Sequence, residues 1–218
     1  MIDLDVVVES LPGLMDGFLN TLWLCLVSAI LALVCGSLLA LADRSGIGWL
    51  RVLIAGYTLT ALSMPLLVLL YLLFFVLPEF GVTLSSNVVG VAGLALYYSP
   101  YVSQVILGAL QAIPEGQFEA GKALGVPQTR LMIRLIIPQM LPLLLPSLTG
   151  LLIGLIKDSA LLSIISVNEF MYASKVAVAN TYAPLEIYIV VGLGYWLLTG
   201  LVDELLRKLE ARSSRHFN

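Results

Sequence analysis

The chain has 218 residues, of which 60% are hydrophobic and only 11% are charged. Its mean hydropathy is +1.01. Soluble domains carry roughly 25% charged residues, so this composition excludes an ordinary soluble enzyme and a disordered protein. The net charge of −3 argues against the basic surface that nucleic-acid binders need, and we expect no nucleic-acid partner. The sequence therefore predicts an all-α membrane protein with a single domain over residues 1–218.

Stretches without Asp, Glu, Lys or Arg predict the helices that cross the lipid bilayer. They cover residues 17–42, 52–78, 80–114, 135–156 and 187–202. A spanning helix needs about 20 apolar residues, and all but the last stretch reach this length. The last stretch reaches it when Glu186, Asp203 and Glu204 lie at the membrane interfaces. We therefore expect five transmembrane helices, near 17–42, 52–77, 88–112, 137–157 and 185–206.

The loops differ in basic residues, and this difference predicts the orientation because cytoplasmic loops are enriched in Lys and Arg. Assigning the loops alternately to two sides leaves only Lys157 and Lys175 on one side. The other side receives Arg44, Arg51, Lys122, Arg130, Arg134, Arg207, Lys208, Arg212 and Arg215. This predicts a cytoplasmic C-terminus and an outward N-terminus. We expect the acidic first 16 residues to form an interfacial segment on the outer face.

The cytoplasmic loop over residues 113–137 carries strong helix-boundary signals. Pro114 can open a helix, Gly125 suits the left-handed residue that ends one, and Pro127 can open the next. We expect two short helices joined by a glycine turn, with Leu131, Ile133 and Leu135 packing the second against the membrane domain. The small residues Ala120 and Gly121 let another protein approach closely. A loop that only lies on the bilayer is the alternative, although its few basic residues argue against it.

Two predicted spans contain a proline beside polar groups, which suggests a path through the membrane. These are Ser63-Met64-Pro65 and Ser99-Pro100-Tyr101, with Gln104 one turn later. A proline removes a helical hydrogen bond, and irregular backbone at membrane depth must face protein or water. Ser63, Pro65, Ser99, Tyr101 and Gln104 are therefore candidate pathway residues. Kinks that serve packing alone are the alternative.

The predicted fourth span shows small or kinking residues at every fourth position, ending in an acid. The series is Pro138, Pro142, Pro146, Gly150, Gly154 and Asp158. Such a stripe suits close helix contact within this chain; an interface with a second subunit or a central gate is the alternative. Ionisable groups beside an uncharged span are often functional, so Lys157 and Asp158 are candidate pathway residues. We expect residues 159–183 to form an outer-face segment with a short helix, whose rim residues Glu169 and Lys175 contact a soluble partner.

The cytoplasmic loop resembles the conserved loop of importer permeases driven by ATP-binding-cassette (ABC) ATPases. That pattern reads E-A-A-x-x-x-G-x9-I-x-L-P. Here Glu119, Ala120, Gly125 and Pro138 match at the same spacing, and Gly121 replaces the third-position alanine. In that family the loop is a coupling helix that inserts into a cleft of the ATPase subunit. The resemblance therefore implies that Glu115, Glu119, Ala120, Gly121, Gly125 and Pro138 couple this chain to an ATPase.

Other segments resemble the polar amino acid (histidine/glutamine/arginine-type) permeases in particular. Residues 112–117 (A-I-P-E-G-Q) are similar to S-I-P-x-G-Q, and 157–161 (K-D-S-A-L) to K-D-T-S-L, which adds Ser159 to the candidate pathway. Tyr57 followed by P-L-L-V at 65–68 is also typical. Charged or polar residues of that family are replaced at Leu62, Leu69, Gln104 and Leu107. These replacements favour a heterodimer with a second, substrate-binding permease, although a homodimer stays possible.

The resemblance implies a multi-pass subunit in the bacterial inner membrane that passes a polar amino acid or similar solute. The sequence has no GxxxxGK[ST] phosphate loop, so we expect no cofactor and no catalysis in this chain; a partner ATPase dimer would bind ATP and magnesium. An extracytoplasmic solute-binding protein would deliver the substrate. The alternative is an ion-coupled secondary transporter, which usually needs intramembrane charges that residues 52–78 and 80–114 lack.

Overall fold

The computed structural model describes residues 4–214, and in this part of the chain the regular secondary structure is all helical, without a strand. The helices are α1 (Leu4–Asp43), α2 (Gly48–Ser63), α3 (Leu66–Tyr71), η1 (Leu72–Val76), η2 (Leu77–Phe80), α4 (Ser86–Gln111), α5 (Glu115–Ala123), α6 (Gln128–Leu131), η3 (Met132–Ile136), α7 (Ile137–Asp158), η4 (Ser159–Ile165), α8 (Phe170–Thr181) and α9 (Pro184–Ser214). Arg215 and the first three residues of the acidic N-terminal segment, which entered the charge argument, lie outside the described residues.

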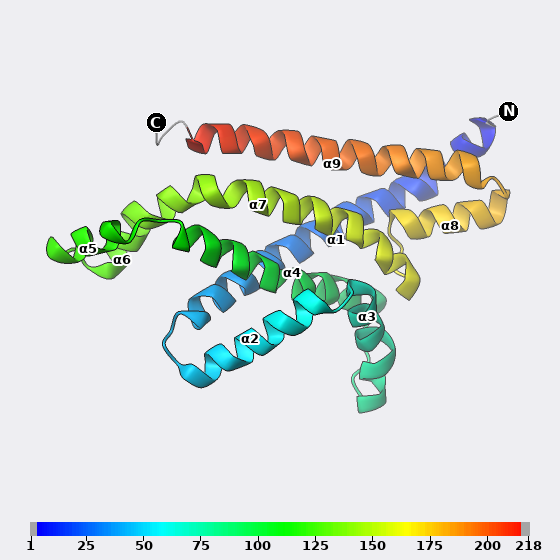
Figure 1. Cartoon of the computed structure of the whole chain (residues 1–218). Helices are drawn as coiled ribbons and strands as arrows, with labels where there is room; N and C mark the ends of the chain where they lie inside the picture. Colours follow the sequence, from blue (N-terminus) through cyan, green and yellow to red (C-terminus); the bar gives the residue numbers. More distant parts are fainter. Residues whose placement is uncertain (1–3, 215–218) are drawn as a thin grey trace.

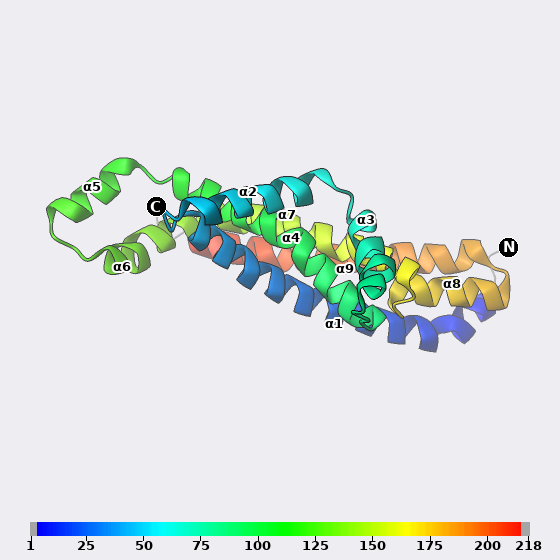
Figure 2. The ribbon, with the colours of Figure 1, turned by 90° about the horizontal axis from the view of Figure 1, so that it is seen from below.

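The long helices run side by side, so the molecule has two distinct ends (Figures 1 and 2). One end holds the α1–α2 turn, the α5–α6 loop and the C-terminal end of α9. The other end holds the start of α1 and the α8–α9 turn. Within the described residues, the basic side chains other than Lys157 and Lys175 belong to the first end or its flanking turns. The two-sided distribution predicted from the loops is therefore present in the fold.

Three helical segments are long and apolar enough to cross a membrane: Leu4–Asp43, Gln128–Ile165 and Pro184–Arg212. A fourth span results if the bent pair Gly48–Ser63 and Leu66–Phe80 is counted as one. α4 is 26 residues long and uncharged, but its tyrosines, serines and glutamines lower its hydropathy. The described part of the chain is thus an all-helical membrane protein, and α4 falls short of the hydropathy that α1, α7 and α9 reach over a membrane-length window.

The helices differ from the predicted transmembrane segments at two places. The first helix begins at Leu4 rather than near 17, because the acidic segment continues α1 instead of forming a separate piece. The helix predicted over 52–77 is broken after Ser63, and its two parts meet at 109°. Met64 adopts an extended conformation there, with φ −104° and ψ 134°. The ring of Pro65 explains the break, since it disfavours helical backbone at the preceding residue.

α1 supports α4 through a stripe of small buried residues. Ser28, Ala32 and Gly36 lie on the buried face of α1, and the Ser28 hydroxyl donates to the carbonyl of Val91 in α4 at 3.5 Å. A Cβ atom added at Gly36 would lie 2.6 Å from the carbonyl oxygen of Ser99 in α4. Small residues at this spacing let two helix backbones approach closely, which suits association inside a membrane.

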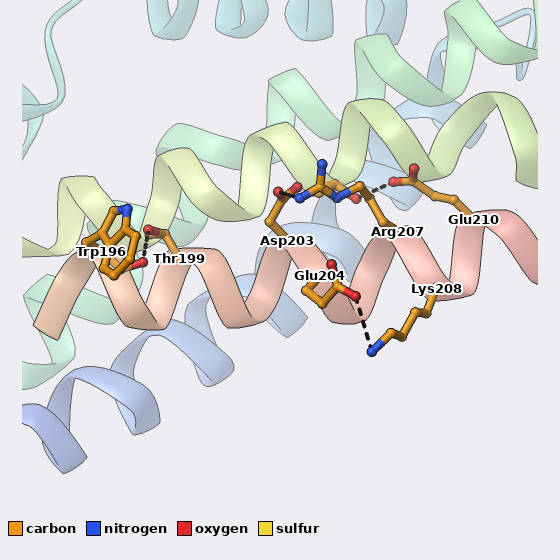
Figure 3. Close-up of polar contacts among 8 residues, drawn as sticks. Trp196, Thr199, Asp203, Glu204, Arg207, Lys208 and Glu210 are labelled. Carbon is orange, nitrogen blue, oxygen red and sulfur yellow. Dashed lines mark hydrogen bonds and ion pairs between the residues drawn. The ribbon is translucent and has the colours of Figure 1, made fainter. Parts of the chain in front are cut away.

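α7 and α9 pack together, and polar contacts mark the end of α9 near the α5–α6 loop. The Thr149 hydroxyl in α7 donates a hydrogen bond to Glu210 at 2.8 Å. Figure 3 shows the charged side chains around Glu210. Asp203 pairs with Arg207 at 2.5 Å, and Glu204 with Lys208 at 3.2 Å, one helical turn apart. Exposed pairs of this kind add little stability. They place charged side chains on the part of α9 that follows its apolar stretch.

Candidate functional site

The kink in α4 is completed by a tyrosine from α2. Pro100 has no N–H group, so the carbonyl of Leu96, four residues earlier, loses its helical donor. The Tyr57 hydroxyl donates to that carbonyl at 2.5 Å and lies 2.9 Å from the Ser99 hydroxyl. Ser99 is 1% exposed. The predicted pathway residue Ser99 therefore takes part in an internal contact between α2 and α4.

A polar aromatic cluster forms where α4 meets the end of α7 that carries Asp158. The Tyr98 hydroxyl donates to a carboxylate oxygen of Asp158 at 2.8 Å. The Tyr101 hydroxyl donates to the Tyr97 hydroxyl at 3.2 Å, and their ring centroids lie 5.4 Å apart. The fold thus brings the predicted residues Tyr101 and Asp158 together, although they are far apart in the sequence. Tyr97 and Tyr98 were missed, but their helical spacing from Tyr101 could have indicated a shared face.

Glycine in α7 makes room for this cluster. A Cβ atom added at Gly154 would lie 3.0 Å from the Tyr98 hydroxyl. The stripe of small residues predicted along α7 therefore packs within the chain at this position. Gly150 has no neighbouring atom within 4 Å of such a Cβ atom and is exposed. The same stripe therefore packs inside the chain at one glycine and stays open at the other.

The remaining predicted pathway residues divide into open and buried ones. Gln104 and Lys157 are exposed on α4 and α7, and Ser63 and Pro65 are exposed at the break between α2 and α3. Ser159 is fully buried, and its hydroxyl donates to the carbonyl of Ile156 at 2.8 Å. The open residues can contact a solute or a second subunit, whereas Ser159 faces the interior of the chain.

The cluster has the chemistry of a cation site rather than of a catalytic centre. A carboxylate attracts an ammonium group, and tyrosine rings add attraction to a cation held over their faces. The Tyr98 hydroxyl fixes the orientation of the Asp158 carboxylate. The arrangement can therefore hold a solute that carries a positive charge without forming a covalent bond.

The loop between α4 and α7 has the predicted form. α5 follows Pro114, α6 follows Pro127, and Gly125 between them has a φ of +68°, the left-handed conformation expected of a helix-ending glycine. Glu115, Glu119 and Ala120 are exposed, as the loop's proposed contact residues should be. Gly121 is buried instead, because a Cβ atom there would lie 2.7 Å from the Leu131 side chain. Pro138 is partly buried at the start of α7.

The apolar residues after α6 pack differently from the prediction. Leu131 is buried at 6% exposure, but Ile133 is 60% exposed and Leu135 is 39% exposed. Ile136 is fully buried in their place. The π-helical turn η3 over Met132–Ile136 explains the difference, since a wider turn shifts the side chains around the helix axis.

The end of the molecule near α5 and α6 offers an open surface. A groove of about 1250 Å³ lies between this loop and the ends of α1, α4 and α7, with Arg44, Gln111, Glu115, Phe118, Lys122 and Met140 among its lining residues. Leu124, at the tip of the loop, is 80% exposed beside Gly125. Figure 2 shows α5 and α6 extending beyond the ends of the long helices. An exposed leucine on a projecting loop indicates a contact surface, although the sequence alone did not single it out.

At the opposite end, the prediction for Glu169 is wrong. This residue was expected at a rim that contacts a soluble partner, but its side chain is fully buried at the start of α8. Lys175 is exposed, and its ammonium group donates to the Ser163 hydroxyl at 2.8 Å. Residues 159–183 otherwise contain the predicted short helix, which is α8.

Known proteins resemble the chain in sequence over most of its length. L-cystine transport system permease protein TcyB from Bacillus subtilis is 32% identical over 97% of this chain and 92% of its own length. Arginine ABC transporter permease protein ArtQ from Escherichia coli is 36% identical over 58% of this chain. The matched region spans about half, 53%, of the length of that arginine permease.

Solved structures show the same fold. A crystal structure of an amino acid ABC transporter with histidines matches with a TM-score of 0.91 and 30% identity, over 97% of this chain and 99% of that one. An inward-facing MetNI methionine ABC transporter matches with a TM-score of 0.76 and 20% identity, over 92% of this chain and 96% of that one, which shows the fold alone. Residues 12–215 match the family described as binding-protein-dependent transport system inner membrane component. The chain therefore belongs to this family of inner membrane transport components.

Proposed function

We propose that this chain is the transmembrane subunit of an ATP-driven importer and forms a pathway for a polar amino acid or similar small solute. The observation that carries the proposal is the projecting α5–α6 loop with its exposed Glu119, its left-handed Gly125 and its exposed Leu124. Family membership supports an importer over the ion-coupled secondary transporter considered first. Amino acid permeases among the relatives support the substrate class.

The proposed topology has five transmembrane helices in the bacterial inner membrane, with the N-terminus outside and the C-terminus in the cytoplasm. α1, the bent α2–α3 pair, α4, α7 and α9 would be the spans. The basic residues near the α5–α6 end support a cytoplasmic position for that end. α4 is protected from lipid by α1 and α2, which fits its lower hydropathy.

The partners would be an ABC ATPase dimer, a second permease and an extracytoplasmic solute-binding protein. Glu115, Glu119, Ala120, Gly121, Gly125 and Pro138 would form or support the ATPase contact. ATP and magnesium would be bound by the ATPase, with hydrolysis there and no catalysis in this chain. The uncharged Gln104 supports a heterodimer whose other permease supplies further polar groups. ATP binding would then shift the balance between two conformations of the pair.

The proposed pathway runs along the face that α4 and α7 share. Tyr101, Gln104, Lys157 and Asp158 would contact the solute, with Asp158 meeting its ammonium group. Ser99 and Ser159 would not contact the solute, since both are buried, and would instead hold the helices that form this face. Ser63 and Pro65 would contribute at the α2–α3 break.

Charge reversal in the coupling loop tests the proposal. We would reconstitute the chain with the ATPase and binding protein that co-purify with it, and measure ATP-dependent amino acid uptake. Glu119→Arg should abolish ATPase co-purification and lower uptake at least about tenfold while membrane insertion stays normal, since each 1.4 kcal/mol of lost docking energy is tenfold. Glu204→Arg is the matched control, because it is exposed at the same end but outside the loop. Unchanged uptake in Glu119→Arg would refute the proposal.

A further inference from the structure

Glu169 is a fully buried carboxylate at the start of α8, and it is held by donors from two helices. One oxygen accepts a hydrogen bond from the Tyr172 N–H at 2.7 Å. The other accepts from the Met171 N–H at 2.8 Å and from the Tyr195 hydroxyl in α9 at 2.9 Å. A buried charge is costly unless hydrogen bonds replace its hydration, and these three donors supply such bonds to the Glu169 carboxylate.

The same segment of chain is also fastened to α1. The Asn20 side-chain amide donates to the carbonyl of Asn168 at 2.6 Å, and the Phe170 N–H donates to the Thr21 hydroxyl at 2.9 Å. A Cβ atom added at Gly17 would lie 3.0 Å from the carbonyl oxygen of Glu169 and closer still to α8. α1, α8 and α9 therefore meet around Glu169 without spare room.

This junction also holds the segment that leads back to the candidate pathway. η4 runs directly from the end of α7, where Asp158 lies, and a left-handed Ser166 with φ 60° joins it to the junction. Lys175 in α8 donates to Ser163 in η4 at 2.8 Å. Tyr195 lies beside the Ser159 hydroxyl at the other end of η4. Both ends of η4 are thus linked to residues that the junction fixes.

A helix cap alone would not need this arrangement. Capping α8 requires only the bonds from the backbone N–H groups of Met171 and Tyr172 to Glu169. The hydroxyl of Tyr195 adds a connection to a helix that is not part of the cap. That connection joins the α7–η4–α8 segment to the long helix α9.

We propose that Glu169 is a positioning residue for transport, which clamps α8 to Tyr195 of α9 and thereby holds η4 and Asp158 at the outer end of the pathway. This inference rests on the proposed function, because it assigns Glu169 a role in that pathway. It requires no contact between Glu169 and the solute. It requires that the clamp fix the position of Asp158 while the pathway opens and closes.

The protonation state of Glu169 gives the clamp a signature that a simple packing residue would lack. Glu169 lies in the connection between spans, and burial raises its pKa to about 7 despite the N–H bonds and the Lys175 charge, which lower it. The titratable groups that face it are Lys175 from α8, Tyr195 from α9 and Cys25 from α1. The three bonds are stronger to the charged carboxylate than to the neutral acid, because charge-assisted hydrogen bonds are about twice as strong as neutral ones. The clamp therefore weakens as the pH falls below about 7.

The test compares Glu169→Gln, Tyr195→Phe and their combination with the wild-type chain, all in reconstituted complexes. Glu169→Gln should lower the maximal uptake rate about tenfold, because bonds to a charged acceptor are worth roughly that factor. The KM for the loaded binding protein should stay within about twofold, and the pH step near 7 should disappear. Tyr195→Phe should lower the rate less, because it removes only one of the three bonds to Glu169, and it should add little to Glu169→Gln, which already weakens that bond. Glu9→Gln, an exposed acid in α1, is the matched control.

Hydrogen exchange of the amides over residues 159–166 gives a readout that does not need transport. Glu169→Gln and Tyr195→Phe should speed exchange in η4, and Glu9→Gln should not. Unchanged exchange, or a wild-type pH profile in Glu169→Gln, would overturn the positioning role. If Glu169→Gln fails to fold, Tyr195→Phe carries the test, since it removes a single hydroxyl. A wild-type complex without any amino acid uptake would instead refute the proposed function, and exchange would still decide the role of Glu169.

Discussion

Removal of the Tyr57 hydroxyl should destabilise the kink in α4 by a magnitude that follows from its contacts. Tyr57→Phe deletes the donor 2.5 Å from the Leu96 carbonyl and leaves only the Ser99 hydroxyl, at 3.3 Å. Losing a hydrogen bond to a carbonyl that Pro100 already deprives of its helical donor costs about 1.5 kcal/mol. For a chain of this length, that loss lowers the melting temperature by about 4 °C. The measurement is thermal unfolding in detergent, monitored by circular dichroism.

Two further variants decide whether the reason is the missing N–H of Pro100. Pro100→Ala supplies a backbone donor for the Leu96 carbonyl, so Tyr57→Phe should cost less than about 0.5 kcal/mol in that background. Tyr188→Phe, at an exposed tyrosine of α9, controls for the loss of a hydroxyl as such and should leave the melting temperature unchanged. An equal cost of Tyr57→Phe with and without Pro100 would refute the reasoning.

Two glycine substitutions test other parts of the fold. Gly36→Ala should destabilise the protein by about 2 kcal/mol, because its Cβ atom would lie 2.6 Å from the backbone of α4. Gly108→Ala has nothing within 4 Å of its Cβ atom and should stabilise α4 by about 0.5 kcal/mol. Thermal unfolding measures both, and shifts of the same sign would contradict this reasoning. Gly125→Ala should lower the amount of co-purified ATPase about fivefold, since an alanine at φ +68° costs roughly 1 kcal/mol. Gly116→Ala in α5 has open space around it and should leave co-purification unchanged; an equal loss in both variants would point to a general effect on the loop.

The α5–α6 loop shows what local sequence can determine. Pro114, Gly125 and Pro127 act on backbone dihedral angles within a few residues, and the structure has the predicted helix, turn and helix there. The position of Ile136 could not be predicted in the same way. Its burial depends on the π-helical turn before α7, which reflects how that turn packs against the neighbouring helices.

The candidate pathway was predictable only as a set of polar residues in apolar helices. Tyr101 and Asp158 were singled out because polar groups at membrane depth are costly, and the fold brings them into one cluster through Tyr97 and Tyr98. Burial was not predictable residue by residue. Ser99 turned toward Tyr57 and Glu169 toward Tyr195, and in both cases the partner comes from a helix far away in the sequence.

The sequence by itself determined the all-helical class, the charge-free stretches, the uneven distribution of basic residues and the form of the α5–α6 loop. These properties depend on composition and on local backbone preferences, which a linear chain already contains. Only the tertiary structure decided the contact of Tyr57 with the α4 backbone at Pro100 and the burial of Glu169. In a membrane helix nearly every face is apolar, so hydropathy does not indicate which face packs inward. That choice depends on which helix lies alongside and which hydrogen-bonding groups it offers.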